Sequence, residues 1–113
     1  MRRGDIVTVA LQGDSGKPRP AVVVQTDLLP PRAKLLVVPL SSNLDDAPLS
    51  RMIVAPTSES GLKHESQLMF DRLTSTRRDR CSNAFGRLDA AQIVELDFHL
   101  NLVFGLLDTK PSS

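Results

Sequence analysis

Brief apolar runs rich in Val, Ile and Leu, bounded by proline, glycine or charged residues, recur through the chain as far as Leu88. Such runs are typical of β-strands, because a helix needs a longer periodic segment to bury one face. We predict strands over residues 6–10, 21–26, 35–38, 51–55, 67–71 and 84–88. The uninterrupted run from Ala21 predicts a strand buried on both faces. Pro39 is expected to end the strand that begins at Leu35.

Beyond these runs, residues 90–107 have a different period. Their larger apolar residues recur at intervals of three and four, which places them on one helix face: Ile93, Leu96, Leu100, Val103, Phe104 and Leu107. Asp89, followed three residues later by Gln92, predicts a capping box at the start of this helix. The pattern as a whole predicts a mainly β fold, a small barrel of five to seven short strands with one C-terminal α-helix packed on it.

Length and charge limit the kinds of protein that this chain can be. Its 113 residues suit one domain over residues 1–113, with a short flexible tail over residues 109–113. Its formal net charge is +1. Without a large net charge, any nucleic-acid partner has to meet a local patch. The sequence has no signal-peptide h-region and no apolar run of membrane-spanning length, which favours a soluble, cytoplasmic protein with no membrane partner.

Metal and cofactor chemistry have little support in the sequence. His64, His99 and Cys81 are the candidate soft or imidazole ligands, and none lies at ligand spacing, so we expect no metal and no cofactor. His99 is expected to have a structural role on the helix and His64 to be solvated. Cys81 follows three arginines that could lower its pKa, yet with no histidine motif nearby we expect an ordinary thiol.

Five arginines and one acidic residue make the segment from residue 72 to residue 87 strongly basic: Arg72, Arg77, Arg78, Arg80 and Arg87 against Asp79. Such a cluster is either a solvated face or a contact surface for phosphates, and the sequence leaves both open. Because the chain has no Trp, no Tyr and four Phe, it offers few platforms for base stacking. Any action on nucleic acid would therefore rest on arginines, backbone groups and shape.

Several motifs follow one another in order along the chain. The opening RRGDIV of residues 2–7 leads to KPRPAVVV at residues 17–24, an Arg-Pro pair before an apolar strand. VVPLSS at residues 37–42 is a strand that ends in two serines, and SQLMFD at residues 66–71, FGRLD at residues 85–89 and the final helix come after it. Together these motifs resemble the MazF/PemK family of bacterial toxin endoribonucleases, in its Arg-Pro signature, its strand that ends in a Thr/Ser pair and its C-terminal order.

The resemblance implies a fold, partners and an activity. The fold is the SH3-like small barrel of the CcdB/PemK-like superfamily, assembled as a homodimer. The activity is that of a type II toxin-antitoxin system toxin, a metal-independent, sequence-selective endoribonuclease that cleaves single-stranded RNA, including mRNA, and so inhibits translation and growth. A cognate MazE-like antitoxin would neutralise it.

Site residues follow from the same resemblance. It implies Arg19 and Ser41 as the catalytic pair, with Asp71 as a contributing acid. Family arginines near that acid are absent, because Met69 and Thr74 stand in their places, and Arg72 is the candidate replacement. The implied substrate-binding residues are Lys17, Ser42, Gln67, Met69 and Arg72.

The chemistry fits a chain without metal ligands. RNA carries its own nucleophile, the 2′-hydroxyl next to the scissile phosphate, so the enzyme supplies alignment, charge stabilisation and proton transfer. Arg19, between Pro18 and Pro20, offers a fork of donors to a phosphate oxygen, and Ser41 can donate to the same charge. Deprotonation of a guanidinium is very unfavourable, so we expect electrostatic stabilisation from Arg19.

Two other functions stay open at this point. The segments 24–28 and 36–41 are also similar to CcdB-type poisons of DNA gyrase, although those proteins carry a C-terminal tryptophan and this chain has none. A non-catalytic barrel that binds an antitoxin is the third possibility, because a fold does not guarantee an activity.

Overall fold

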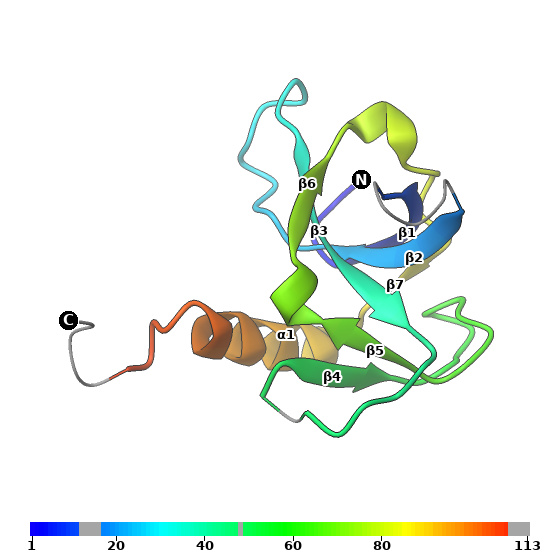
Figure 1. The fold of residues 1–113 in the computed structure, drawn as a ribbon. Coiled ribbons are helices and arrows are strands. Elements are labelled where there is room, and N and C mark those ends of the chain that lie inside the picture. The colour runs from blue at the N-terminus through cyan, green and yellow to red at the C-terminus, as the bar shows by residue number, and fades with distance from the viewer. Residues whose placement is uncertain (12–16, 48, 109–113) are drawn as a thin grey trace.

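The fold is a single antiparallel sheet curled into a half-barrel, with one helix against it (Figure 1). The computed structural model describes residues 1–11, 17–47 and 49–108; the predicted tail at residues 109–113 and the middle of the predicted 12–18 loop lie outside these ranges. Seven strands in the described residues form the sheet, in the order β4-β5-β3-β2-β1-β7, with β6 also paired to β3. The prediction of a mainly β fold with a C-terminal helix is confirmed.

The elements differ in the length of their connections, the longer ones being residues 24–34 and 55–65. In sequence order they are β1 (Asp5–Ala10), β2 (Pro18–Val23), β3 (Leu35–Ser41), β4 (Arg51–Val54), β5 (Ser66–Met69), the 3-10 turn η1 (Phe70–Arg72), β6 (Thr74–Thr76), the 3-10 turn η2 (Arg78–Arg80), β7 (Gly86–Arg87) and α1 (Ala90–Val103).

Pro39 does not end β3, contrary to the prediction. The backbone carbonyl of Leu36 accepts a hydrogen bond from Val24 N–H, so the even-numbered residues of β3 bond toward β2 and Pro39 faces the other edge. At that edge β6 pairs only as far as Val37, and β5 begins at Leu40. The missing N–H of Pro39 therefore falls between two partner strands, where no ladder bond is lost.

Other strand boundaries also differ from the prediction. The predicted strand at residues 67–71 becomes β5 and then η1, and the predicted strand at residues 84–88 contracts to β7. β2 begins at Pro18, ahead of the predicted start, and ends at Val23. β6 has the polar sequence TST and gave no apolar signal, so it was not predicted. Residues 21–25 are all buried, as the apolar run predicted.

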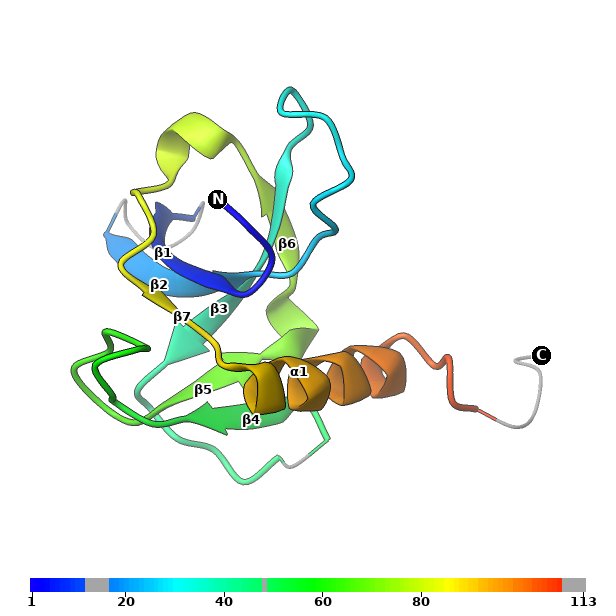
Figure 2. The same cartoon turned by 180° about the vertical axis from the view of Figure 1, so that it is seen from behind.

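The two faces of the sheet carry two apolar clusters. Alternation along each strand sends one set of side chains to the larger cluster, which contains Ile6, Val22, Val38, Leu40, Met52, Leu68 and Phe70 among others. The other set forms a smaller cluster of Val7, Val9, Ala21, Val23, Leu35 and Val37. Leu96 of α1 belongs to the larger cluster, with Ile93 and Leu100 packed against it. The helix therefore covers that face, behind β4 and β5 in Figure 1 and in front of them in Figure 2.

The start of α1 is as predicted, and its end is not. Asp89 accepts from Gln92 N–H (2.7 Å) and the Gln92 side chain accepts from Asp89 N–H (2.8 Å), which completes the capping box. The helix ends at Val103 because Gly105 adopts a positive φ of 72°, and Leu106 N–H bonds to Asn101 oxygen in a Schellman turn. The last two residues of the predicted face, Phe104 and Leu107, lie beyond the helix and are exposed.

No helix in the described part of the chain combines the length and the apolar character needed to cross a bilayer.

Candidate active site

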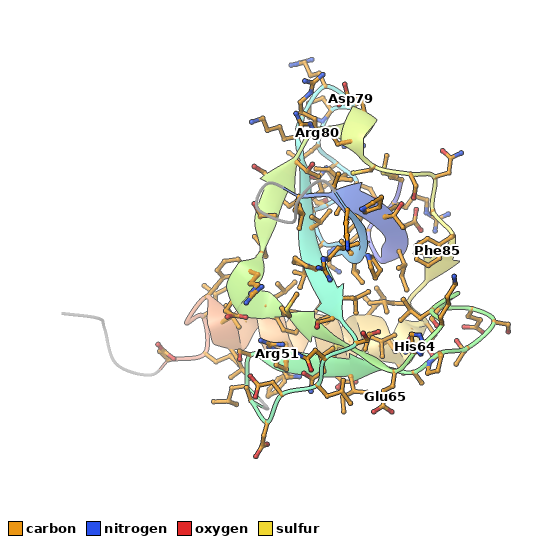
Figure 3. The ribbon with its side chains drawn as sticks, turned by 45° about the vertical axis from the view of Figure 1, so that its right-hand side comes forward. Arg51, His64, Glu65, Asp79, Arg80 and Phe85 are labelled. Atoms are coloured by element: carbon orange, nitrogen blue, oxygen red, sulfur yellow. The ribbon has the colours of Figure 1, made fainter. Side chains whose placement is uncertain are left out.

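A polar groove of about 900 Å³ opens on the sheet face opposite α1. Strands β2, β3, β5 and β6 contribute to it, together with β4, the end of β1, the loop after β3 and the segment around η2. Its lining residues are Ala10, Leu11, Arg19, Lys34, Pro39, Leu40, Ser41, Asn43, Leu44, Asp45, Arg51, Met69, Arg72, Thr74, Ser75, Thr76, Arg77 and Arg80. In Figure 3, Arg51 on β4 and Arg80 at η2 lie far apart, so the groove extends across much of this face.

The register of the sheet brings Arg19 and Ser41 together. Strands β2 and β3 pair Ala21 with Pro39, and continuing this antiparallel register by two residues sets Arg19 opposite Ser41. Residues directly opposite each other in a sheet present their side chains to the same face. Both residues, which the resemblance to toxin ribonucleases implied as a catalytic pair, line the groove.

The same row continues across the sheet. Ser41 pairs with Gln67 of β5, and Met69, two residues further on, pairs with Arg51 of β4. Met69 and Arg51 line the groove, while Gln67 is buried. Arg51 Nε is buried and has no hydrogen-bond partner among the described residues. A buried guanidinium nitrogen without a partner is costly, so Arg51 is suited to receive an acceptor from a ligand.

The Ser41 hydroxyl has local partners only. Its oxygen accepts a hydrogen bond from Asn43 N–H (3.1 Å), and it lies 3.5 Å from the Asn43 carbonyl. This turn fixes Ser41 at the point where the chain leaves β3. The remaining donor capacity of the hydroxyl is weakly used, because a 3.5 Å contact is at the outer limit for a hydrogen bond.

Among the residues that the structure describes, six cationic side chains and one carboxylate line the groove: Arg19, Lys34, Arg51, Arg72, Arg77 and Arg80 against Asp45. Within the described ranges, the ion pairs of these cations reduce to one, between Arg77 and Asp79; Arg19 also has an interaction partner. Clustered positive charge in a concave surface concentrates anions there. The described lining of the groove therefore has a charge that attracts anions.

The structure places the predicted site residues in three different settings. Arg19, Ser41, Met69 and Arg72 line the groove, whereas Lys17, Ser42 and Asp71 are exposed residues outside its lining. Gln67 is 5% exposed and turns away from solvent to bond the backbone of Asp45.

The basic segment at residues 72–87 is also divided by the fold. Arg72, Arg77 and Arg80 line the groove. Arg78 Nε instead donates to the carbonyl of Ala33 (3.0 Å), and Arg87 Nη1 donates to Asp5 Oδ1 (2.6 Å). The cluster is thus partly a charged groove wall and partly structural.

Sequence reasoning missed Lys34, Asn43 and Arg51. Arg51 had a usable signal, because Met52 and Val54 alternate with it in a predicted strand and point inward, so Arg51 points outward. Lys34 lies in a loop and gave no signal.

Cys81 and His99 are not part of the groove lining. Burial raises the pKa of the Cys81 thiol, outweighing the nearby Arg78, and the Asp79 carboxylate raises it further. Arg78 does lower this pKa, as the sequence suggested for the neighbouring arginines, but burial outweighs that effect, in line with an ordinary thiol. His99 is buried, stacks on Phe70 with ring centroids 5.1 Å apart and donates from Nδ1 to the Leu49 carbonyl (3.2 Å). Its role is structural, as predicted.

Metal ligands do not gather in the described residues, where no group of three or more His, Cys, Asp or Glu side chains is arranged to hold an ion.

Comparison with known proteins identifies relatives of this chain. A family model described as PemK-like, MazF-like toxin of type II toxin-antitoxin system matches residues 2–104. The probable endoribonuclease MazF of Mycolicibacterium smegmatis is 39% identical over 107 residues, covering 94% of this chain and 98% of that protein. Endoribonuclease MazF9 of Mycobacterium tuberculosis is 30% identical over 112 residues, covering 90% and 94%.

Solved structures agree on the fold. The Mycobacterium tuberculosis toxin MazF-mt6 superimposes with a TM-score of 0.76 at 19% identity, covering 89% of this chain and 96% of that one. A mycobacterial endoribonuclease in complex with its cognate antitoxin gives 0.74 at 17% identity, with coverage of 100% and 99%. The MazE-MazF complex of Deinococcus radiodurans gives 0.69 at 18% identity, with coverage of 93% and 96%.

The protein is thus an antiparallel half-barrel that carries a cationic groove on one face of its sheet and a C-terminal helix on the other, and the solved toxin structures share this fold. The chain belongs to the family of PemK-like, MazF-like toxins of type II toxin-antitoxin systems.

Proposed function

We propose that this toxin is a metal-independent endoribonuclease that cleaves single-stranded RNA in the cytoplasm at selected sequences, and thereby inhibits translation and growth. The observation that carries the proposal is the placement of Arg19 opposite Ser41 in a groove whose described lining holds six cations and one carboxylate. The relatives of known name that share most of the chain are endoribonucleases.

The chemistry requires little beyond alignment and charge. The 2′-oxygen of the RNA attacks the adjacent phosphorus, the bond to the 5′-oxygen breaks, and a cyclic 2′,3′-phosphodiester forms. The proton of the 2′-hydroxyl passes to solvent and the leaving 5′-oxygen receives one from solvent, so the step balances. Arg19 stabilises the charge that develops on the non-bridging oxygens, and Ser41 donates to the same oxygens.

The other predicted site residues have supporting roles in this proposal. Arg72 and Met69 contact the RNA from the groove wall. Lys17 and Ser42 lie next in sequence to the Arg-Pro signature and to Ser41, where flanking nucleotides pass. Asp71 lies in η1 next to Arg72, outside the groove lining, and its negative charge acts on the scissile phosphate from there. Gln67 acts on the substrate through the loop that it holds.

Two protein partners complete the proposal. The toxin forms a homodimer, because α1 leaves apolar side chains exposed: Val94 is 71% exposed and Phe98 54%, and Leu106 and Leu107 follow. A MazE-like antitoxin neutralises the toxin with an acidic segment that covers the cationic groove. Structural neighbours of this chain have been solved with antitoxin partners.

The test is cleavage of a long single-stranded RNA in excess EDTA, with the fragment ends mapped. We expect discrete cuts whose upstream fragments end in a cyclic phosphate, and loss of each cut when the nucleotide that supplies the 2′-hydroxyl is replaced by its 2′-deoxy form. Activity that needs added magnesium, or cutting that survives the 2′-deoxy replacement, would contradict the mechanism.

A further inference from the structure

The segment of residues 77–82, which contains η2, places Arg77 and Arg80 in the lining of the groove, at the end nearest β1. Its backbone is tied to β1 by an isolated bridge between Val9 and Cys81 and by hydrogen bonds between Thr8 and Ser82, each 2.9 Å. A segment anchored in this way loses little conformational entropy when its side chains bind a ligand.

Arg78 anchors the same segment on its other side. Its Nε donates to the carbonyl of Ala33 (3.0 Å), and Lys34, the next residue, lines the groove together with Arg77 and Arg80. Arg78 thus donates a hydrogen bond to the fold, while Arg77 and Arg80 on either side of it line the groove. Two separate loops are brought together here, each contributing positive charge.

We propose that Arg77, Arg80 and Lys34 form a second phosphate-binding position, which takes the backbone of the RNA beyond the scissile phosphate at Arg19 and Ser41. This inference rests on the proposed function, since it extends the path of the same strand. Three cations stand here against one carboxylate, Asp79, which pairs with Arg77. Neither Arg80 nor Lys34 has a carboxylate partner among the described residues.

The floor of this part of the groove favours a backbone contact over base recognition. Thr74, Ser75 and Thr76 of β6 line it with small side chains. Among its described residues, the lining contains no aromatic ring on which a base could stack. Guanidinium groups bind phosphate oxygens through paired donors. The position therefore strengthens binding without selecting sequence, and its loss leaves the cut sites unchanged.

The experiment measures binding and cleavage by Arg80→Gln beside the control Lys63→Gln, which removes the same charge from an exposed residue outside the groove. The probe for binding is a fluorescent single-stranded oligonucleotide of about 12 nucleotides with 2′-deoxy sugars, which the proposed chemistry cannot cut. Affinity is followed by anisotropy over a range of salt concentrations. Cleavage is followed on the matching RNA.

For Arg80→Gln we expect the slope of log K against log salt to fall by about 0.7, and the affinity near 0.1 M salt to fall about fivefold, the contribution of one phosphate contact to a single strand. The loss should appear in KM, and the cut sites should stay the same. Asp79→Asn should change affinity in the opposite direction, because it removes the one carboxylate of the segment. Lys63→Gln should match the parent protein.

Three outcomes would overturn the inference. If the parent protein cuts RNA and Arg80→Gln matches Lys63→Gln in slope and KM, the second position does not exist and the proposed function stands. If Arg80→Gln leaves binding of the oligonucleotide unchanged and lowers only the affinity for a poly-glutamate peptide measured in the same way, the patch is a protein contact. If the parent protein neither cuts nor binds RNA, the proposed function fails and the inference fails with it.

Discussion

The side-chain amide of Gln67 holds the backbone of Asp45 through two hydrogen bonds, each 2.8 Å long. Gln67 Oε1 accepts from Asp45 N–H, and Gln67 Nε2 donates to the Asp45 carbonyl. Asp45 belongs to the loop that follows Ser41 and forms one wall of the groove. The buried Gln67 side chain of β5 thus holds this loop in place. Gln67 can therefore position the site without contact with the substrate.

Gln67→Glu tests this positioning role. The variant keeps the acceptor for Asp45 N–H, but it replaces the donor with an oxygen that faces the Asp45 carbonyl. We expect a loss of about 1–3 kcal/mol in the free energy of unfolding, because the buried side chain at residue 67 loses a hydrogen bond and sets an oxygen against the Asp45 carbonyl. Hydrogen exchange at the Asp45 amide should become faster, and KM for RNA should rise more than kcat falls. Unchanged exchange at Asp45 would contradict the clamp.

The packing of α1 on the sheet gives a stability prediction. Leu96 is fully buried in the larger apolar cluster, so Leu96→Ala should lower the free energy of unfolding by about 2–5 kcal/mol. Glu95→Ala, at an exposed position on the same helix, should change it by less than about 0.5 kcal/mol. Urea denaturation of both variants makes the comparison. Equal effects would mean that the helix does not cover this face.

The thiol of Cys81 should react slowly. Burial raises its pKa, so at pH 8 a smaller fraction is thiolate than in a free cysteine, and the thiolate is the nucleophile. We expect alkylation by iodoacetamide to be slower than for a model thiol, to accelerate as the pH rises toward 10, and to reach the model rate in denaturant. A native protein that reacts at pH 7 as fast as glutathione would show that the arginines control this thiol.

Most of the fold could be predicted from local patterns in the sequence. The apolar runs located β1, β3 and β4, and the Asp89–Gln92 pair located the start of α1, because these elements depend on neighbours in the sequence. β6 could not be found in this way, since its polar residues become a strand only when β3 offers them an edge. The continuation of β3 through Pro39 likewise depends on where β6 stops and β5 begins.

In the candidate site, too, some features could be predicted from the sequence and others depend on contacts between distant residues. Arg19 and Ser41 were assigned together through motifs, and the register of β2 and β3 supplies the physical reason for their proximity. The separate roles of Arg77, Arg78 and Arg80 are not encoded locally, because they depend on a contact with Ala33, more than forty residues away in the chain. The buried orientation of Gln67 also had no sequence signal, since its partner is the backbone of a distant loop.

The most direct test of the account is cleavage of single-stranded RNA in excess EDTA by the parent protein, Arg19→Ala and the control Arg32→Ala, whose arginine is exposed and outside the groove lining. Circular dichroism first confirms that all three are folded. We expect discrete cuts from the parent and the control, and a loss of at least about a hundredfold in kcat for Arg19→Ala, the cost of removing a donor to the developing charge. A folded Arg19→Ala protein that cuts at the parent rate would contradict the account.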